Sequence, residues 1–210
     1  MIDVMMFPTG VLGTNTYVIK DKETDFIAIV DPGCEDRALT NYLDSIPKIK
    51  VRYILLTHGH FDHIGAAEFY KNRYEAKIII SSEDGDFLKD PDLNLSGMFA
   101  KPLEPVSADT YVLDGDVLDL GRSKFKFMLT PGHTRGSGCF VFEEDSVIFS
   151  GDTLFYSSIG RTDFPTSDPV QMQNSLKKLA SFTKDYTVYP GHNQITTLNR
   201  EKENNPYLKY

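Results

Sequence analysis

Short runs of β-branched and aromatic residues open the chain and are separated by polar turns. The runs are residues 2–7, 15–20 and 26–30. Such runs, bounded by turn residues, are typical of strands, and the short turn 21–25 predicts that the second and third form a hairpin. The pattern then changes to helical spacing over residues 36–46, and Pro47 is expected to stop that helix.

The middle of the chain alternates between buried strands and helical segments. Residues 51–56 and 76–80 are continuous apolar runs, and residues 64–74 between them have helical spacing. Strand and helix in alternation favour an α/β architecture. Residues 91–105 read as a loop-like insertion whose apolar Leu95, Met98 and Phe99 are predicted to cover the mouth of the site described below.

The second half of the chain is also rich in strands. The predicted strands are 111–113, 117–120, 124–129, 139–142, 147–149 and 186–189. A helix is predicted over 170–182, with Asp168 as its N-cap and Pro169 at its first position, and a short helix near 197–203. With no repeat or linker between the halves, the simplest organisation is a single domain over residues 1–210.

Composition and charge narrow the class of protein. The 210 residues carry a net charge of -8, with 40% hydrophobic and 25% charged residues, which is typical of a globular enzyme. An acidic chain without a basic run does not favour nucleic acid or anionic membranes as partners, so a small-molecule substrate is expected. Cys34 and Cys139 are expected to be reduced thiols, and the absence of a signal peptide favours a cytoplasmic protein.

Four ligand-type residues lie within six positions, directly after the predicted strand 51–56. They form the pattern His58-x-His60-x-Asp62-His63. In an extended segment His58 and His60 point to the same side, so both can reach one metal ion, and Asp62 and His63 suit a second. Imidazole and carboxylate together suit zinc, iron or manganese. The sequence therefore predicts a metal site at this strand end.

The other two histidines also follow predicted strands. His133 comes after strand 124–129, His192 after strand 186–189, and Asp152 after strand 147–149. Each has a glycine beside it, which permits a tight turn of the backbone. All five histidines are thus candidates for the same metal site.

This ordered set of seven residues resembles the metallo-β-lactamase superfamily over nearly the whole chain. The resemblance implies a four-layer αββα sandwich, an α/β fold, with the metals at one edge between two sheets. It implies His58, His60 and His133 as ligands of one metal, and Asp62, His63 and His192 as ligands of a second. Asp152 would bridge the two, and the complete set favours the binuclear subgroups over true β-lactamases. The implied cofactors are two divalent ions, with zinc favoured and iron or manganese compatible.

A second motif is similar to the short, bacterial-type members of the glyoxalase II group. It comprises residues 149–155, the stretch Gly160-Arg161-Thr162-Asp163-Phe164, and Pro190-Gly191-His192. The resemblance implies hydrolysis of hydroxyacylglutathione-like thioesters by a hydroxide that two metals share, with Asp62 and Asp152 orienting it. The C-terminal basic helices of longer members are missing, and Asn193-Gln194 replaces the usual aromatic pair. Arg161 remains the candidate for binding a substrate carboxylate.

Further assignments and alternatives follow from the same residues. Asp31 is expected behind the histidine loop as a supporting carboxylate, with Thr57 and Thr134 as further orienting groups. Persulfide dioxygenases resemble the chain too, and would use one iron on His58, His133 and Asp152. A lactone or phosphodiester hydrolase and a non-catalytic metal-binding module are the other readings. Metal identity, thiol carrier, acyl group and oligomeric state stay open at this point.

Overall fold

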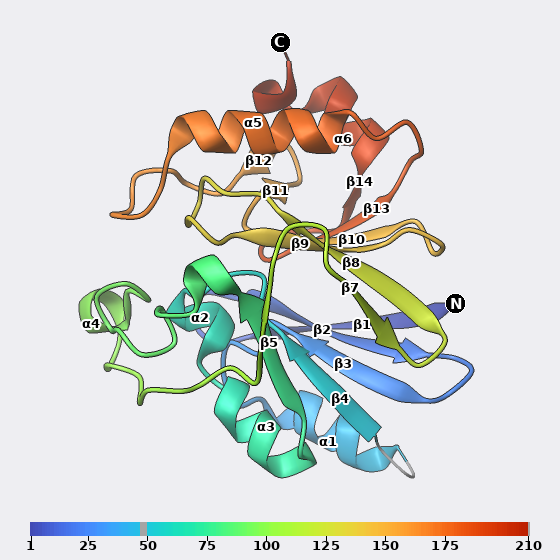
Figure 1. Ribbon diagram of the computed structural model, residues 1–210, viewed down its shortest axis with the longest axis vertical. Helices are drawn as coiled ribbons and strands as arrows, with labels where there is room; N and C mark the ends of the chain where they lie inside the picture. The colour runs from blue at the N-terminus through green and yellow to red at the C-terminus, as the bar shows by residue number, and fades with distance from the viewer. Residues whose placement is uncertain (47–49, 210) are drawn as a thin grey trace.

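The computed structural model describes residues 1–46 and 50–209, and its core is two stacked β-sheets (Figure 1). The strands of the first sheet are β1 (Ile2–Thr9), β2 (Thr14–Asp21), β3 (Phe26–Val30), β4 (Lys50–Leu55), β5 (Lys77–Ser81) and β6 (Thr110–Val112). Those of the second are β7 (Val117–Leu120), β8 (Ser123–Leu129), β9 (Gly138–Phe142), β10 (Val147–Gly151), β13 (Thr187–Pro190) and β14 (Thr196–Thr197). Their spatial orders are β1-β2-β3-β4-β5-β6 and β14-β13-β10-β9-β8-β7.

Helices cover the outer face of each sheet. The first sheet carries α1 (Arg37–Ser45) and α3 (Ala67–Tyr74), and the second carries α5 (Pro169–Ala180) and α6 (Leu198–Asn204) (Figure 1). The short helices α2 (Phe61–Ile64) and α4 (Ser96–Phe99) lie at one edge of the sandwich. The predicted four-layer αββα sandwich is therefore confirmed.

Strand alternation builds three apolar interfaces from this layering. In β3, Ile27 and Ile29 pack against the helices, whereas Ala28 and Val30 face the second sheet, as the two-residue period of a strand requires. The interface between the sheets is rich in aromatic rings. These include Tyr17, Phe125, Phe127, Phe140, Phe142 and Phe149, all buried.

Most element boundaries agree with the sequence pattern. The hairpin of β2 and β3 is present, and the Asp168 side chain caps α5 by accepting the backbone N–H groups of Val170 and Gln171. Asp36 caps α1 in the same way, through the N–H of Leu39. The predicted helix stop at Pro47 lies outside the described residues. Both cysteines are free, as expected.

The single helix predicted over 64–74 is wrong. The structure has two helices, α2 and α3, broken at Gly65 and Ala66. The Ala66 N–H donates to the Pro32 carbonyl, and a Cβ on Gly65 would lie 2.3 Å from the Gly33 carbonyl oxygen. This contact with the loop after β3 interrupts the helix, and it sets Asp62 within the first turn of α2 rather than before a helix.

Two further segments differ from the prediction. Residues 91–105 are not entirely loop, because Ser96–Phe99 form one helical turn, α4. The small hairpin of β11 (Leu154–Phe155) and β12 (Ser158–Ile159) was not predicted, and neither was β14. These strands are two residues long, too short to show a period in the sequence. None of the helices in the described part of the chain has the length and apolarity needed to cross a membrane.

Candidate metal centre

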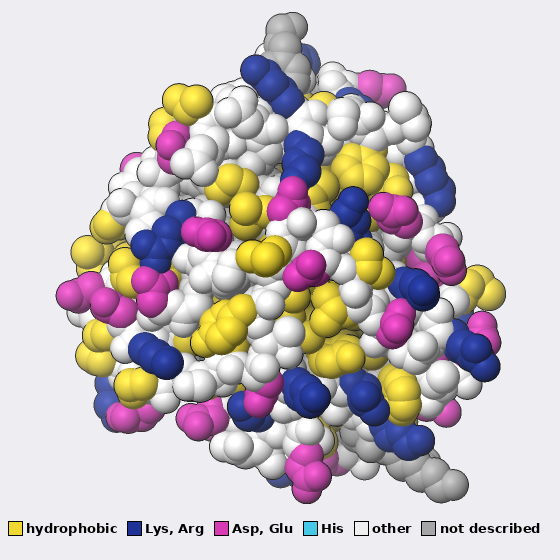
Figure 2. All heavy atoms as spheres, in the orientation of Figure 1, with side chains coloured by type: hydrophobic (Ala, Val, Ile, Leu, Met, Phe, Trp, Pro, Cys, Tyr) yellow, Lys and Arg dark blue, Asp and Glu magenta, His cyan; other side chains and the backbone are white. Residues whose placement is uncertain are grey.

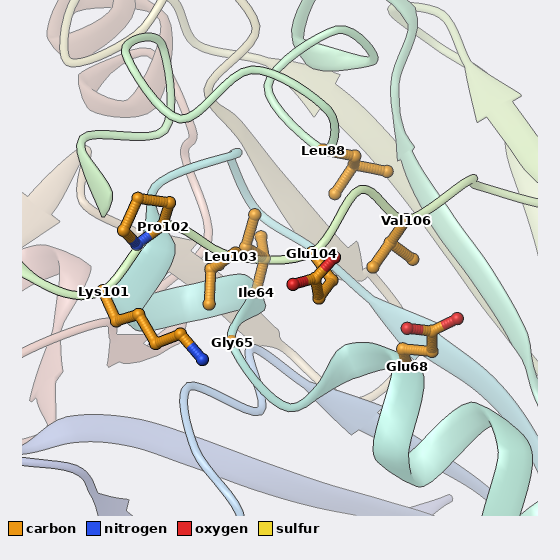
Figure 3. A pocket seen from close by; sticks show the side chains of 9 residues that line it. All are labelled: Ile64, Gly65, Glu68, Leu88, Lys101, Pro102, Leu103, Glu104 and Val106. Atoms are coloured by element: carbon orange, nitrogen blue, oxygen red, sulfur yellow. The ribbon is translucent and has the colours of Figure 1, made fainter. Parts of the chain in front are cut away.

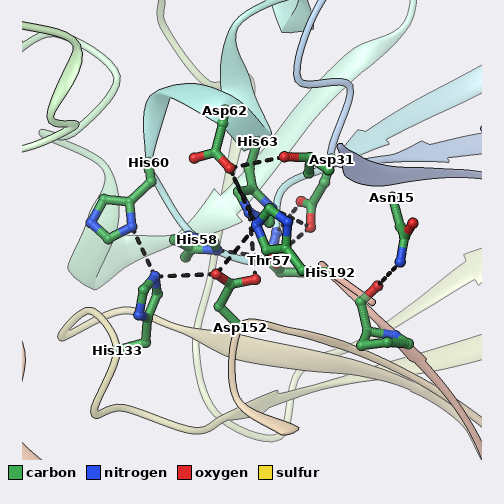
Figure 4. A network of polar contacts seen from close by, with 12 residues as sticks. Asn15, Asp31, Thr57, His58, His60, Asp62, His63, His133, Asp152 and His192 are labelled. Atoms are coloured by element: carbon green, nitrogen blue, oxygen red, sulfur yellow. Dashed lines mark hydrogen bonds and ion pairs between the residues drawn. The ribbon is translucent and has the colours of Figure 1, made fainter. Parts of the chain in front are cut away.

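The seven ligand-type residues of the sequence prediction lie together at one edge of the sandwich (Figure 4). The chain leaves the carboxyl ends of β4, β8, β10 and β13 at this edge, and each exit carries members of the set. The first sheet supplies His58, His60, Asp62 and His63. The second sheet supplies His133, Asp152 and His192. The site is thus a seam between the two sheets.

Three overlapping groups within this set have the spacing of metal ligands. We call His58, His60 and His133 the first cluster, and Asp62, His63 and His192 the second cluster. In each cluster the candidate ligand atoms lie within 4.8 Å of one another, and a third such group joins His58, His63 and Asp152. Figure 4 shows the Asp152 carboxylate between His133 and His192, at 3.4 and 3.6 Å from their Nε2 atoms.

The unsatisfied atoms of the site fit a metal ion. Among the described residues, three buried side-chain atoms lack a hydrogen-bond partner: His58 Nε2, His60 Nε2 and Asp152 Oδ1. All three belong to the set of seven. An unpaired buried polar group costs about 1–3 kcal/mol, and a cation on the ligand-facing atoms would remove part of that cost. Imidazole and carboxylate are also the donors that zinc, iron and manganese accept.

The first cluster is buried and made of uncharged rings. His58, His60 and His133 are at most 3% exposed. Burial lowers the pKa of His58 and of His60 well below the usual imidazole value, and the neighbouring imidazoles lower it further. Burial also lowers the pKa of His133, although Asp152 opposes this effect. The rings are therefore neutral at pH 7, the form in which they bind metal.

The second cluster has the opposite electrostatics. Burial disfavours the charged form of His63, but Asp62, Asp152 and Asp31 outweigh it and raise its pKa to about 10. The pKa of His192 is also raised, because its hydrogen bond to Asp62 and the charge of Asp152 outweigh burial. His63 and His192 in turn hold the pKa of Asp62 below its usual range despite burial. Protons therefore occupy this cluster when no cation is bound.

Asp31 lies where the sequence predicted it, behind the histidine loop. Its Oδ2 is 3.0 Å from His63 Nδ1, and it accepts the Thr57 hydroxyl at 2.7 Å and, through Oδ1, the Thr57 N–H at 2.8 Å. The Thr57 oxygen is 3.2 Å from His58 Nδ1 and can accept its N–H. These contacts orient His58 and His63 so that Nε2 of each faces the centre of the site.

Asp84, which the sequence analysis did not identify, ties the two loops of the first cluster together. It follows β5 and is fully buried. It accepts the N–H of Gly59 at 3.0 Å, the N–H of Gly136 at 2.8 Å and the Thr134 hydroxyl at 2.7 Å. Despite these hydrogen bonds, burial raises its pKa to about 6. Its position after a buried strand at this edge was the available signal.

Thr14 and Asn15, at the start of β2, support the second cluster and were also missed. The Thr14 hydroxyl donates to Asp62 Oδ2 at 2.8 Å. The Asn15 amide donates to the carbonyls of Pro190 and Asn193, and its backbone N–H donates to the Gly191 carbonyl at 2.7 Å. Asn15 of the first sheet therefore fixes the turn of the second sheet that carries His192.

One glycine lets that turn approach the centre closely. A Cβ on Gly191 would lie 2.3 Å from Asp152 Oδ1 and 2.7 Å from His63 Cε1. Real Cβ contacts are essentially never that short, so a side chain at this position would displace the ligand-type residues. The glycine before His192 is thus required by packing as well as by the turn.

A cavity of about 650 Å³ opens beside the two clusters. Its walls include Leu95 and Phe99 of the 91–105 segment, whereas Met98, 68% exposed, is not part of them. Arg161 also lies on the wall, but its guanidinium donates to both oxygens of Asp163, at 2.6 and 2.7 Å. The backbone carbonyl of Arg161 accepts the N–H of His133 Nδ1 at 2.8 Å, which orients that ring.

A smaller cavity, about 290 Å³, lies behind α2 (Figure 3). Apolar side chains such as Ile64, Leu88 and Val106 form its walls, with Glu68 and Glu104 at its rim. It contains none of the seven ligand-type residues. The chemistry therefore concentrates at the larger cavity.

The surface view is consistent with the burial of the histidines. No histidine side chain is visible on the face in Figure 2, where basic and acidic side chains are interspersed. Of the five histidines only His192, with 21% of its side chain exposed, reaches solvent appreciably. Access to the centre is thus through the larger cavity.

Comparison with known proteins gives a consistent result. The profile of the Metallo-beta-lactamase superfamily matches residues 9–192. The hydroxyacylglutathione hydrolase GloC of Haemophilus influenzae is 33% identical over 214 residues, which cover 99% of this chain and 98% of the relative. Among solved structures, BLEG-1 B3 metallo-beta-lactamase matches with a TM-score of 0.93 and 32% identity, covering 99% and 100% of the two chains. The di-iron-bound form of TTHA1623 matches with a TM-score of 0.84 and 31% identity, covering 97% and 100%.

Proposed function

The chain belongs to the metallo-beta-lactamase superfamily, and we propose that within it this protein is a metal-dependent thioester hydrolase of the hydroxyacylglutathione hydrolase type. The observation that carries the proposal is the full set of seven ligand-type residues, held in two clusters at the wall of one cavity. The 33% identity with a hydroxyacylglutathione hydrolase along the whole length supports the choice of a thioester.

The proposal assigns each cluster to one divalent ion. His58, His60 and His133 would hold the first, and Asp62, His63 and His192 the second, with Asp152 between them. When bound, two such ions supply a water that ionises near neutral pH and Lewis-acid polarisation of a carbonyl oxygen. We propose zinc, with iron or manganese compatible with the same donors; a related protein was crystallised in a di-iron-bound form.

The residues of this chain would orient the reacting groups. Asp62 and Asp152 present carboxylate oxygens to the centre and would accept hydrogen bonds from the attacking water, which aligns it with the thioester carbonyl. Asp31 keeps the His63 ring fixed while charge shifts at the centre. In the reaction the water oxygen bonds to the acyl carbon, the carbon–sulfur bond breaks, and the departing thiol takes up a proton.

Thiol release from S-lactoylglutathione by metal-replete protein tests the proposal. Turnover should be lost in His58→Ala, because His58 belongs to two of the three ligand groups. Absence of thiol release from this and from other thioesters, in protein shown to contain two ions, would contradict it. In that case oxygen uptake with a persulfide becomes the next assay. A single iron on His58, His133 and Asp152 would leave the second cluster without a role.

A second candidate function is hydrolysis of β-lactams. The likeness to BLEG-1 B3 metallo-beta-lactamase, with a TM-score of 0.93 and 32% identity, favours it. The same water and the same carboxylates would attack a lactam carbonyl. A chromogenic cephalosporin assayed beside the thioester separates the two functions by the ratio of their kcat/KM values.

A further inference from the structure

The larger cavity has an apolar wall. Apart from the metal-type residues and Arg161, only apolar side chains line it. They include Val11, Leu12, Phe61, Phe99, Phe155 and Phe164. These residues come from the β1–β2 turn, α2, α4 and the segment after β10, so four separate parts of the chain contribute apolar groups to one surface.

Several of these side chains are exposed to solvent. Val11 is fully exposed, and Leu12 and Phe99 are 55% and 57% exposed. Burying apolar surface stabilises a complex by roughly 25 cal/mol per Å². A ligand that covers these side chains therefore gains binding free energy in proportion to its own apolar area.

The only cation on the wall is already paired. Arg161 makes two hydrogen bonds to Asp163, and its guanidinium carbon lies 4.2 Å from the centroid of the Phe164 ring. Both its hydrogen-bonding edge and one face are thus occupied. A substrate carboxylate would have to compete with Asp163 for this guanidinium.

From this wall we infer that the preferred thioesters have an apolar acyl group and an uncharged thiol carrier, rather than the anionic glutathione carrier. We infer also that Asp163 is a specificity-determining residue, because it withdraws Arg161 from substrate carboxylates. The inference rests on the proposed thioesterase function.

Four thioesters test the substrate class. They combine two carriers, glutathione and N-acetylcysteamine, with two acyl groups, lactoyl and the aromatic mandeloyl. We expect kcat/KM to be higher with the uncharged carrier for either acyl group, and roughly tenfold higher with mandeloyl than with lactoyl. The effect should lie mainly in KM, because the wall binds the substrate without contacting the reacting atoms.

Asp163→Asn tests the role of the ion pair. Freeing Arg161 should raise kcat/KM for the glutathione thioesters by about two- to fivefold, the range of an exposed ion pair, and leave the N-acetylcysteamine thioesters unchanged. Asp44→Asn is the matched control. Asp44 pairs with Arg73 through two hydrogen bonds on the outer face of the first sheet, so the variant removes the same charge far from the cavity.

A binding measurement complements the kinetics. Thioether analogues, which lack the carbonyl and cannot be hydrolysed, allow Kd to be measured by calorimetry. The uncharged analogue should bind more tightly to the wild type, and the difference should shrink in Asp163→Asn.

The outcomes separate the inference from the function on which it rests. A preference for the glutathione carrier, equal rates with both carriers, or no response to Asp163→Asn would overturn the inference while the protein remained a thioesterase. If all four thioesters are inert with two ions bound, the thioesterase proposal itself fails, and the inference with it.

Discussion

The two clusters of the metal centre differ in burial and in charge although they lie side by side. The first cluster consists of three imidazoles, buried and neutral at pH 7. The second includes a carboxylate, is partly exposed at Asp62 and His192, and has imidazoles whose pKa values are raised. The first is therefore ready for a cation, whereas the second is already balanced by protons.

The supports of the clusters differ in the same way. Asp84, a single buried carboxylate, holds both loops of the first cluster. Thr14 and Asn15, two neutral side chains of one strand, hold the second. Two ions of the same element would thus meet two environments. We expect the first to bind tightly and the second to respond to pH and to exchange more readily.

The largest expected effect comes from removing a ligand of the first cluster. His58→Ala should lower turnover at least about a thousandfold, because metal activation of water contributes several kcal/mol. His192→Ala, at the exposed side of the second cluster, should cause a smaller loss and leave one ion bound. Elemental analysis of both variants beside the kinetics checks this. Two ions retained by His58→Ala would contradict the assignment of the first cluster.

Removing the support of the first cluster should have the next largest effect. Asp84→Ala leaves the N–H groups of Gly59 and Gly136 without acceptors and should lower the free energy of unfolding by about 3 kcal/mol. Thermal and denaturant unfolding of the metal-free protein measures this. Asp86→Ala, an exposed neighbour paired with Arg135, is the control and should change stability by less than about 0.5 kcal/mol. Equal losses would show that Asp84 has no special role.

The pH dependence of ion binding should distinguish the clusters directly. The pKa of His63 is raised to about 10, so below that pH a cation must displace its proton. Affinity at the second cluster should therefore rise with pH, by about tenfold per unit for one displaced proton, between pH 6 and 9. At the first cluster the imidazoles are already neutral, and affinity should change little. Chelator competition measures both, and parallel pH profiles would disprove the difference.

The smallest effect should come from the support of the second cluster. Thr14→Val removes the hydrogen bond to Asp62 and should weaken the second ion by about fivefold, the value of one hydrogen bond. Binding of the first ion should not change. Thr40→Val, which removes a hydroxyl bonded to the Asp36 carbonyl on the outer helix α1, is the matched control. A shift in both ions would indicate a general loss of packing.

The sequence predicts the layers well because they depend on local periodicity. Alternation in β3 and the Asp168-Pro169 start of α5 are both visible within a few residues. The histidine motif is visible for the same reason, since four candidate ligands fall within six positions. The break of the helix at Gly65 is not visible, because its cause is the carbonyl of Gly33 on another loop.

The supports of the site escape sequence reasoning for a similar reason. Thr14 is 48 residues from Asp62, and Asn15 is 175 residues from Pro190. Nothing in the neighbourhood of either residue indicates these contacts, which exist only once the sheets are packed. The pairing of Arg161 with Asp163 is local, two residues apart, yet its consequence for the cavity requires the position of the wall.

The seam between the sheets also has a consequence for biosynthesis. His63 and His192 are 129 residues apart in the chain, and ribosomes add roughly 5–20 residues per second. On the order of ten seconds thus pass between the synthesis of the histidine loop and that of the residue that completes the second cluster. During that interval the nascent chain presents only the first sheet's ligands to the metal pool of the cell. The order of translation therefore favours late loading of the second ion.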